Sequence, residues 1–132
     1  MENHKYLTDA GLQPDEIMQN MFGDGDERNE YWKSQRDTYG FDEREIWNLD
    51  TTFIQWIYEH LMMYMEQASE CISLSYHKFW IDGDEKTQGD CIDEMISISK
   101  ELLTMDDLDD RYYDSCQRLC RIWSIVLPTM WF

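Results

Sequence analysis

The stretch from Phe41 to Ala68 constrains the fold most, because it is the longest strongly periodic segment of the 132-residue chain. Its apolar residues recur every three or four positions, the pattern of an amphipathic helix. Gly40 interrupts the preceding segment, Asp42 can cap the helix start, and Glu45 stands three residues later as the capping-box partner. We therefore expect a central helix over about 42–69. Its expected apolar face comprises Ile46, Leu49, Phe53, Trp56, Ile57, His60, Leu61, Tyr64 and Ala68.

Shorter segments flank this helix. Apolar spacing predicts further helices over about 14–22, 27–39, 88–104 and 108–127, and Thr87 with Asp90 forms a second capping pattern. Residues 72–81 alternate partly between apolar and polar and precede the turn signal Asp82-Gly83-Asp84, so they are interpreted as a small strand or hairpin arm. The predicted fold is mainly α in a single domain, residues 1–132. It has four to five helices around the central one and room for one short β-hairpin near 72–81.

Composition limits the classes of function. The chain carries 28 acidic and 11 basic residues, a net charge of −17, and an aromatic fraction of 14% that a disordered chain would not have. Nucleic-acid phosphates and anionic membranes both attract clusters of Lys and Arg, so we expect the protein to bind neither directly. We expect instead a protein partner with a basic surface. No export signal or membrane-spanning run is visible, and the four cysteines are interpreted as reduced, cytosolic thiols.

The sequence offers no recognisable catalytic motif, so we predict that the protein is not an enzyme and holds no cofactor. Cys116 and Cys120 are spaced like two metal ligands on one helical face, but no CxxC pair accompanies them, and core packing is the favoured interpretation. His60 is expected to be a buried, hydrogen-bonded residue of the central helix, since no nucleophile accompanies it in a catalytic pattern. The acidic segments 24–30 and 82–85 are interpreted as solvated turns, not calcium loops. No metal site is predicted.

The acidic clusters depart most from an ordinary domain. Solubility explains most charged surfaces, yet −17 exceeds the magnitude of about 2–8 that suffices for a small domain. A compact helical body covered with carboxylates can imitate duplex DNA, which carries one charge per ~1.7 Å of axis. Two clusters flank helix starts, where their side chains project together, and we predict that they contact the partner. These candidate partner-binding residues are Asp82, Asp84, Glu85, Asp106, Asp107, Asp109, Asp110 and Asp114.

Part of the chain resembles a family of small proteins from phages and prophages of gut and related bacteria. The shared features are a Gly-Phe start, an Arg-x-x-Trp-x-Leu-Asp core, a long helix and a His-Lys-Phe stretch before a second helix. The resemblance covers about residues 39–103 and leaves residues 1–38 and the last helix outside. It implies a phage gene acting in the cytoplasm of the bacterial host, with the motif residues structural and Arg44 and Asp50 as polar anchors around Trp47. The matching residues are Gly40, Phe41, Arg44, Trp47, Leu49, Asp50, His77, Lys78 and Phe79.

Charge and this resemblance together lead to two functional hypotheses. The first is a phage inhibitor of a host defence nuclease, of the anti-CRISPR type, that blocks the basic DNA-binding or PAM-reading channel of a Cas effector by DNA mimicry. The second is a phage structural or assembly module that forms a large homo-oligomer through an aromatic and Met-rich surface, whereas a monomer or homodimer is expected of the inhibitor. Trp131-Phe132 and the face that carries Met62, Met63 and Met65 are the candidates for that surface.

Overall fold

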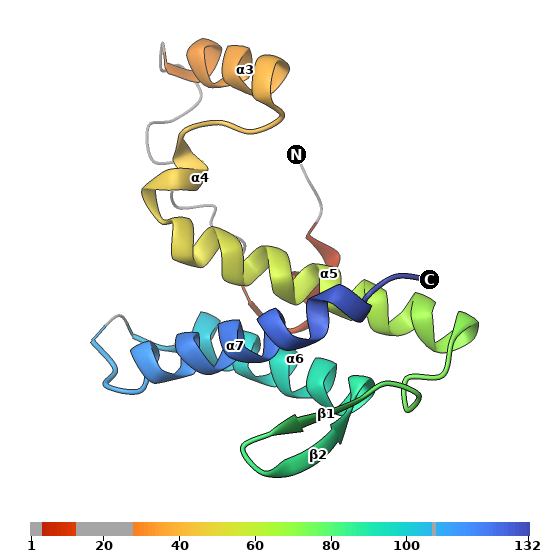
Figure 1. Cartoon of the computed structure of the whole chain (residues 1–132). Coiled ribbons are helices and arrows are strands. Elements are labelled where there is room, and N and C mark those ends of the chain that lie inside the picture. Colours follow the sequence, from red (N-terminus) through yellow and green to blue (C-terminus); the bar gives the residue numbers. More distant parts are fainter. Residues whose placement is uncertain (1–3, 13–27, 107) are drawn as a thin grey trace. The chain divides into compact units, whose positions relative to one another are not determined.

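The structure, a computed structural model, describes residues 4–12, 28–106 and 108–132 (Figure 1). The described part is mainly helical with one two-stranded sheet, so the predicted fold class is confirmed. Two compact units divide the chain, residues 1–55 and residues 56–132. No helix in the described part is long and apolar enough to cross a membrane.

The first unit contains α1 (Lys5–Asp9), α3 (Arg28–Tyr39), α4 (Arg44–Trp47) and the start of α5 (Leu49–Cys71). α3 ends at Gly40, whose φ of +84° is a left-handed conformation that glycine adopts without strain. The Gly40 N–H donates to the carbonyl of Arg36 at 2.8 Å and so closes the last turn of α3. The predicted helix over about 14–22 lies outside the described residues.

The helix predicted over about 42–69 is in fact two helices. α4 ends at Asn48, whose φ of −125° and ψ of 66° are not helical, and α5 then runs for 23 residues. The expected start was wrong because Asp42 does not cap a long helix. Its carboxylate is buried in contacts with two arginines, and the N-cap position of α4 falls on Glu43.

The second unit packs the rest of α5 with α6 (Gln88–Thr104), α7 (Tyr112–Val126) and the 3-10 helix η1 (Leu127–Thr129) (Figure 1). α6 and α7 contact each other and bury residues spaced three and four apart, as amphipathic helices do. On α5 the buried face is rotated from the predicted one, because Trp56 and His60 are exposed. The buried apolar side chains of this unit are Ile57, Tyr58, Leu61, Ala68, Ile81, Cys91, Ile92, Met95, Leu102, Leu119, Ile122 and Val126.

α6 begins where the capping pattern predicts. The Thr87 hydroxyl accepts from the Asp90 N–H at 3.1 Å, and the Asp90 carboxylate accepts from the Thr87 N–H at 3.1 Å, which completes a capping box. The first two N–H groups of the helix, those of Gln88 and Gly89, have no acceptor within it. They donate to the carbonyls of His77 and Leu74, at 3.0 and 2.9 Å. Residues 72–77, predicted as extended, therefore close the start of α6 and form no strand.

β1 (Lys78–Ile81) and β2 (Asp84–Thr87) form an antiparallel hairpin that lies further along the chain than the predicted 72–81. Its turn residues Asp82 and Gly83 have φ of +54° and +82°, and a type I′ turn requires both to be positive. The register pairs Trp80 with Glu85 and Ile81 with Asp84. Ile81 is buried, whereas Trp80, on the opposite face of β1, is exposed.

Candidate interaction surface

The predicted partner-binding carboxylates fall in two places of the second unit. One is the hairpin turn, and the other is the connector between α6 and α7 together with the first turn of α7. Asp107 lies outside the described residues. Asp109 is half-buried, and the other six are exposed. These carboxylates differ in whether a cation of the protein itself pairs with them. Where such an internal ion pair exists, a cation of the partner must compete with it for the carboxylate.

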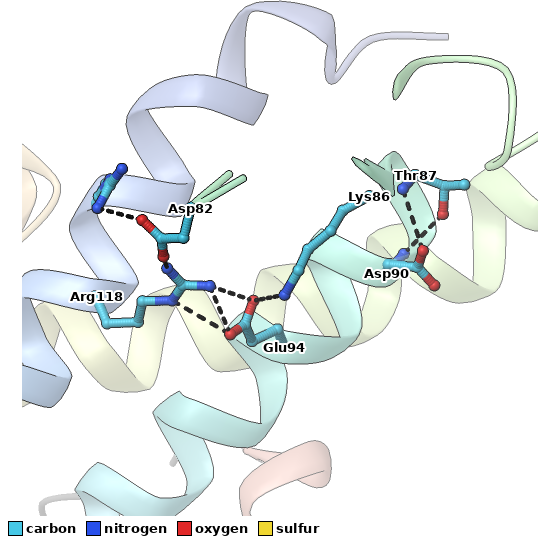
Figure 2. A network of polar contacts seen from close by, with 7 residues as sticks. Asp82, Lys86, Thr87, Asp90, Glu94 and Arg118 are labelled. Carbon is cyan, nitrogen blue, oxygen red and sulfur yellow. Dashed lines mark hydrogen bonds and ion pairs between the residues drawn. The ribbon is translucent and has the colours of Figure 1, made fainter. Parts of the chain in front are cut away.

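Asp82 is already paired within the protein. It forms ion pairs with Arg118 and with Arg121, the latter at 2.8 Å, both from α7. Arg118 also binds Glu94 of α6 at 3.0 Å, and Lys86 of β2 reaches the same carboxylate at 3.3 Å (Figure 2). We call these five residues the hairpin network. They connect the hairpin to both α6 and α7.

The hairpin network is locally basic, since it joins three cations to two carboxylates on a protein with a net charge of −17. Burial by itself lowers the pKa of Arg118, but the hydrogen bonds and charges of Glu94 and Asp82 outweigh burial, and the pKa is raised. Arg118 therefore remains charged throughout the ordinary pH range. A partner's cation that approaches Asp82 meets two arginines already in place.

Asp109 is paired as well. Arg111 donates to its carboxylate through Nε at 3.1 Å, through Nη2 at 2.9 Å and through its backbone N–H at 2.9 Å. These hydrogen bonds, the side-chain ones first, lower the pKa of Asp109 to about 2. Arg111 also reaches the carboxylate of Glu101 at 3.2 Å, so it joins the connector to the last turns of α6.

Five of the predicted carboxylates have no cationic partner among the described residues, and we call them the open carboxylates. Asp106 accepts a hydrogen bond from the Leu108 N–H at 3.1 Å, which shapes the connector without neutralising the charge. Asp114 lies in the first turn of α7, where the helix dipole favours a negative charge. The open carboxylates are Asp84, Glu85, Asp106, Asp110 and Asp114.

α7 connects the two groups of open carboxylates. Asp114, Arg118 and Arg121 are spaced four and three residues apart, which places them along one face of this helix. Arg118 binds Asp82 at the hairpin turn. Asp114 lies about one helical turn, ~5.4 Å along the axis of α7, before Arg118. The hairpin turn and the start of α7 therefore belong to one continuous surface of the second unit.

The residues weighed above for catalysis or metal binding do not come together. The described part of the chain holds no group of three or more His, Cys, Asp or Glu placed to bind a metal ion. His60 is exposed, not buried as predicted. Its ring stacks on Trp56 at 4.1 Å between centroids, and its Nδ1 lies 2.7 Å from the Trp56 carbonyl oxygen. Cys120 is exposed and Cys116 is half-buried, so the core packing predicted for both is wrong for Cys120. The buried residues of α7 are Leu119, Ile122 and Val126.

The segment from Asp42 to Trp47 forms a polar anchor in the first unit. Asp42, only 4% exposed, accepts from Arg36 Nη1 at 2.7 Å and from Arg44 Nε and Nη2 at 2.9 and 2.7 Å. The Arg44 guanidinium lies 4.4 Å from the ring centroid of Trp32, close enough for a cation–π contact. Trp47 packs edge-on against the same ring, with centroids 6.0 Å apart. Arg44 is thus a polar anchor, but it holds Asp42 and the Trp32 ring, whereas the sequence suggested Arg44 and Asp50 around a packed Trp47. Trp47 is 39% exposed, and Asp50 is exposed as well.

The sequence did not reveal an exposed aromatic side chain on the hairpin. Trp80 is 74% exposed and stands directly opposite the open carboxylate Glu85. The only signal in the sequence was a Trp two residues before Asp82-Gly83, and the face it occupies depends on a hairpin register that a single sequence does not fix. The cationic partners of Asp82 were also missed, since Arg118 lies 36 residues further along the chain.

Comparisons with protein-family models, with curated protein sequences and with solved structures found no match for this chain.

Proposed function

We propose that the protein is an acidic inhibitor of phage origin that occupies the basic DNA-binding surface of a host defence nuclease. The observation that most supports this proposal is the set of open carboxylates, which the fold exposes without supplying a cation among the described residues. Such carboxylates can pair with Arg and Lys side chains that otherwise bind phosphates. A Cas effector fits as the class of target, because its channel holds duplex DNA with positive charge and reads the PAM through arginines.

The distribution of charge suits this mechanism. Residues 56–132 contain 15 acidic and six basic residues, a net charge of −9, and residues 1–55 contain 13 and five, a net charge of −8. A negative field of this size speeds association with a basic surface. The association should weaken as salt rises, because the screening length falls to about 10 Å at 0.1 M salt. Inhibition is then steric and electrostatic, and it requires no chemical step.

Neutralising the open carboxylates tests the proposed contact surface. The test variant converts four of them to amides, Asp84→Asn, Glu85→Gln, Asp110→Asn and Asp114→Asn. A matched control makes the same change in net charge at four exposed positions elsewhere, Glu30→Gln, Asp37→Asn, Glu70→Gln and Asp93→Asn. The parent and both variants, each shown to be folded by circular dichroism, then capture proteins from host lysates containing CRISPR effectors, with mass-spectrometric identification across a salt series.

We expect the parent and the control variant to retain a Cas effector or another DNA-handling enzyme at low salt. The test variant should retain at least about tenfold less, since four exposed ion pairs of ~0.5 kcal/mol together contribute about 2 kcal/mol. Equal retention by the test variant and the parent would show that the contact surface lies elsewhere. Failure of the parent to retain any DNA-handling enzyme would contradict the proposed function itself.

A phage structural or assembly module is a second candidate, which exposed aromatic side chains favour. Trp131 is 76% exposed, and Phe132 is 58% exposed even though its ring packs edge-on against Tyr64 at 5.4 Å. Met63, from the Met-rich face, is exposed too. Apolar side chains that stay exposed in one chain can be covered in an oligomer.

Salt separates the two candidates, because it acts on them in opposite directions. Chains with a net charge of −17 repel one another, so screening should strengthen self-association through an apolar surface while it weakens electrostatic binding to a basic partner. Size-exclusion chromatography with light scattering at low and high salt measures this. A large homo-oligomer that persists at high salt favours the assembly module, and a monomer or dimer favours the inhibitor.

A further inference from the structure

The outer face of the hairpin presents an aromatic ring and a carboxylate side by side. Trp80 of β1 and Glu85 of β2 are directly opposite in the register, so both side chains project from the same face. Ile81 and Asp84, which flank the two-residue turn, form a hydrogen-bonded pair in such hairpins. Trp80 and Glu85 then form the next, non-hydrogen-bonded pair, where facing side chains lie closest, about 4.5–5.5 Å between Cβ atoms.

Both side chains are available to a partner. Trp80 is 74% exposed and Glu85 is exposed as well. Within the described part of the protein, no cation lies over the Trp80 ring and none pairs with Glu85. Asp82, two residues from Trp80, is the contrasting case, because arginines from α7 already hold its carboxylate.

The rest of the fold holds this face in position. Ile81 is buried on the opposite side of the hairpin, and Asp82 at the turn is bound by Arg118 of α7 (Figure 2). At the other end of β2, Thr87 forms the capping box that starts α6. A recognition surface that is fixed before binding loses less conformational entropy when the partner arrives.

We propose that Trp80 and Glu85 form a recognition site for an arginine side chain of the basic partner. A planar guanidinium stacks on the indole ring and donates hydrogen bonds to the carboxylate at the ring edge. A lysine is a compact, strongly hydrated point charge, so it gains from the carboxylate but little from the ring. This inference rests on the proposed function for the existence of a basic partner, and it adds the residue type that the partner presents.

Two short peptides and the intact protein test the site. The full chain, labelled with ¹⁵N, is titrated with the eight-residue peptides (Arg-Gly)₄ and (Lys-Gly)₄ at low salt. The reporter is the indole N–H resonance of Trp80, identified among the six tryptophans by its loss in Trp80→Phe. The indole of Trp131, which is 76% exposed, is the internal control for nonspecific binding. We expect the arginine peptide to shift the Trp80 resonance more than the Trp131 resonance, with an affinity about three- to fivefold tighter than that of the lysine peptide.

Two variants, each with one carboxylate neutralised, test whether Glu85 is the carboxylate that binds the arginine. Glu85→Gln should weaken the effect of the arginine peptide on Trp80 by about threefold or more. Asp84→Asn removes the same charge from the adjacent position, whose side chain points to the opposite face, and should change the affinity by less than about twofold. Equal affinities of the two peptides at Trp80, absence of any Trp80 shift, or an equal loss in both variants would overturn the site. A different result contradicts the proposed function alone: the parent captures no DNA-handling enzyme from lysate, while the peptide titration still shows that Trp80 prefers arginine.

Discussion

Asp42 is the one charged side chain that is buried among the described residues. A buried carboxylate is costly unless charged partners and hydrogen bonds compensate for the lost water. Burial by itself raises the pKa of Asp42, but hydrogen bonds from Arg44 and then Arg36 more than reverse this, and its pKa is lowered from the ordinary 3.8. The folded first unit therefore favours the ionised form of Asp42 more strongly than the unfolded chain does.

Replacing Asp42 with Asn keeps the shape of the side chain and removes its charge. We expect Asp42→Asn to lower the free energy of unfolding of the first unit by about 2–4 kcal/mol at neutral pH, because two arginines lose their buried partner. The folded pKa is depressed, so this contribution is present in full above about pH 5 and is lost as pH falls through the folded value. Urea unfolding of parent and variant, followed at the Trp32 indole resonance, measures the difference at each pH.

A matched variant and the pH dependence of the unfolding free energy control this experiment. Asp37→Asn, an exposed change of the same kind on α3, should stay within about 0.5 kcal/mol of the parent at every pH. The difference in unfolding free energy between parent and Asp42→Asn should stay constant from pH 7 to about pH 5 and should narrow as pH falls further. A difference that stays constant below about pH 5 as well, or none at pH 7, would mean that Asp42 does not hold the unit together through its charge.

At the scale of elements, Thr87 joins the hairpin to α6, because it is the last residue of β2 and the N-cap of the helix. Thr87→Ala removes the side-chain half of the capping box and should cost about 1 kcal/mol of stability in the second unit. Thr104→Ala is the matched change at the other end of α6, where the hydroxyl donates to the Glu101 carbonyl at 2.8 Å, and it should cost less than half as much. Thermal unfolding measures both variants, and equal effects would argue against the capping role.

Much of this element structure could be predicted, because its determinants are local. The capping box at Thr87, the glycine after α3 and the apolar spacing of α6 all lie within a few residues of the features they define. The sequence prediction missed the break at Asn48 and the ion pair between Asp42 and Arg36 of α3. β2 was missed because the sequence Asp-Glu-Lys-Thr has no strand pattern of its own and pairs only through the turn before it.

For the candidate surface, the sequence predicted which carboxylates are exposed but not which of them form internal ion pairs. Exposure of the carboxylates followed from their chemistry, since unpaired acidic residues are almost never buried. Which of them the protein neutralises did not follow, because Asp82 finds Arg118 across 36 residues of chain and a single sequence carries no sign of that pairing. The pairing of Trp80 with Glu85 depends likewise on a register that only the structure provides.

At the scale of the whole molecule, the excess negative charge is shared between both units, at −8 and −9. In the hairpin network, cations of the second unit form ion pairs between its own elements. The open carboxylates are what remains on that surface without an internal cation among the described residues. In the proposed function, these carboxylates take the place of DNA phosphates on a basic partner.

Competition by duplex DNA shows whether the open carboxylates occupy the phosphate-binding surface of the partner. A host enzyme captured on the immobilised protein is challenged with duplex DNA at constant ionic strength, with an uncharged polymer of similar size as the control. If the carboxylates occupy the phosphate-binding surface, duplex DNA should release the enzyme in proportion to its concentration, and the polymer should not. If the enzyme binds DNA and still stays on the immobilised protein, the carboxylates do not replace DNA phosphates, because the two ligands then occupy different surfaces.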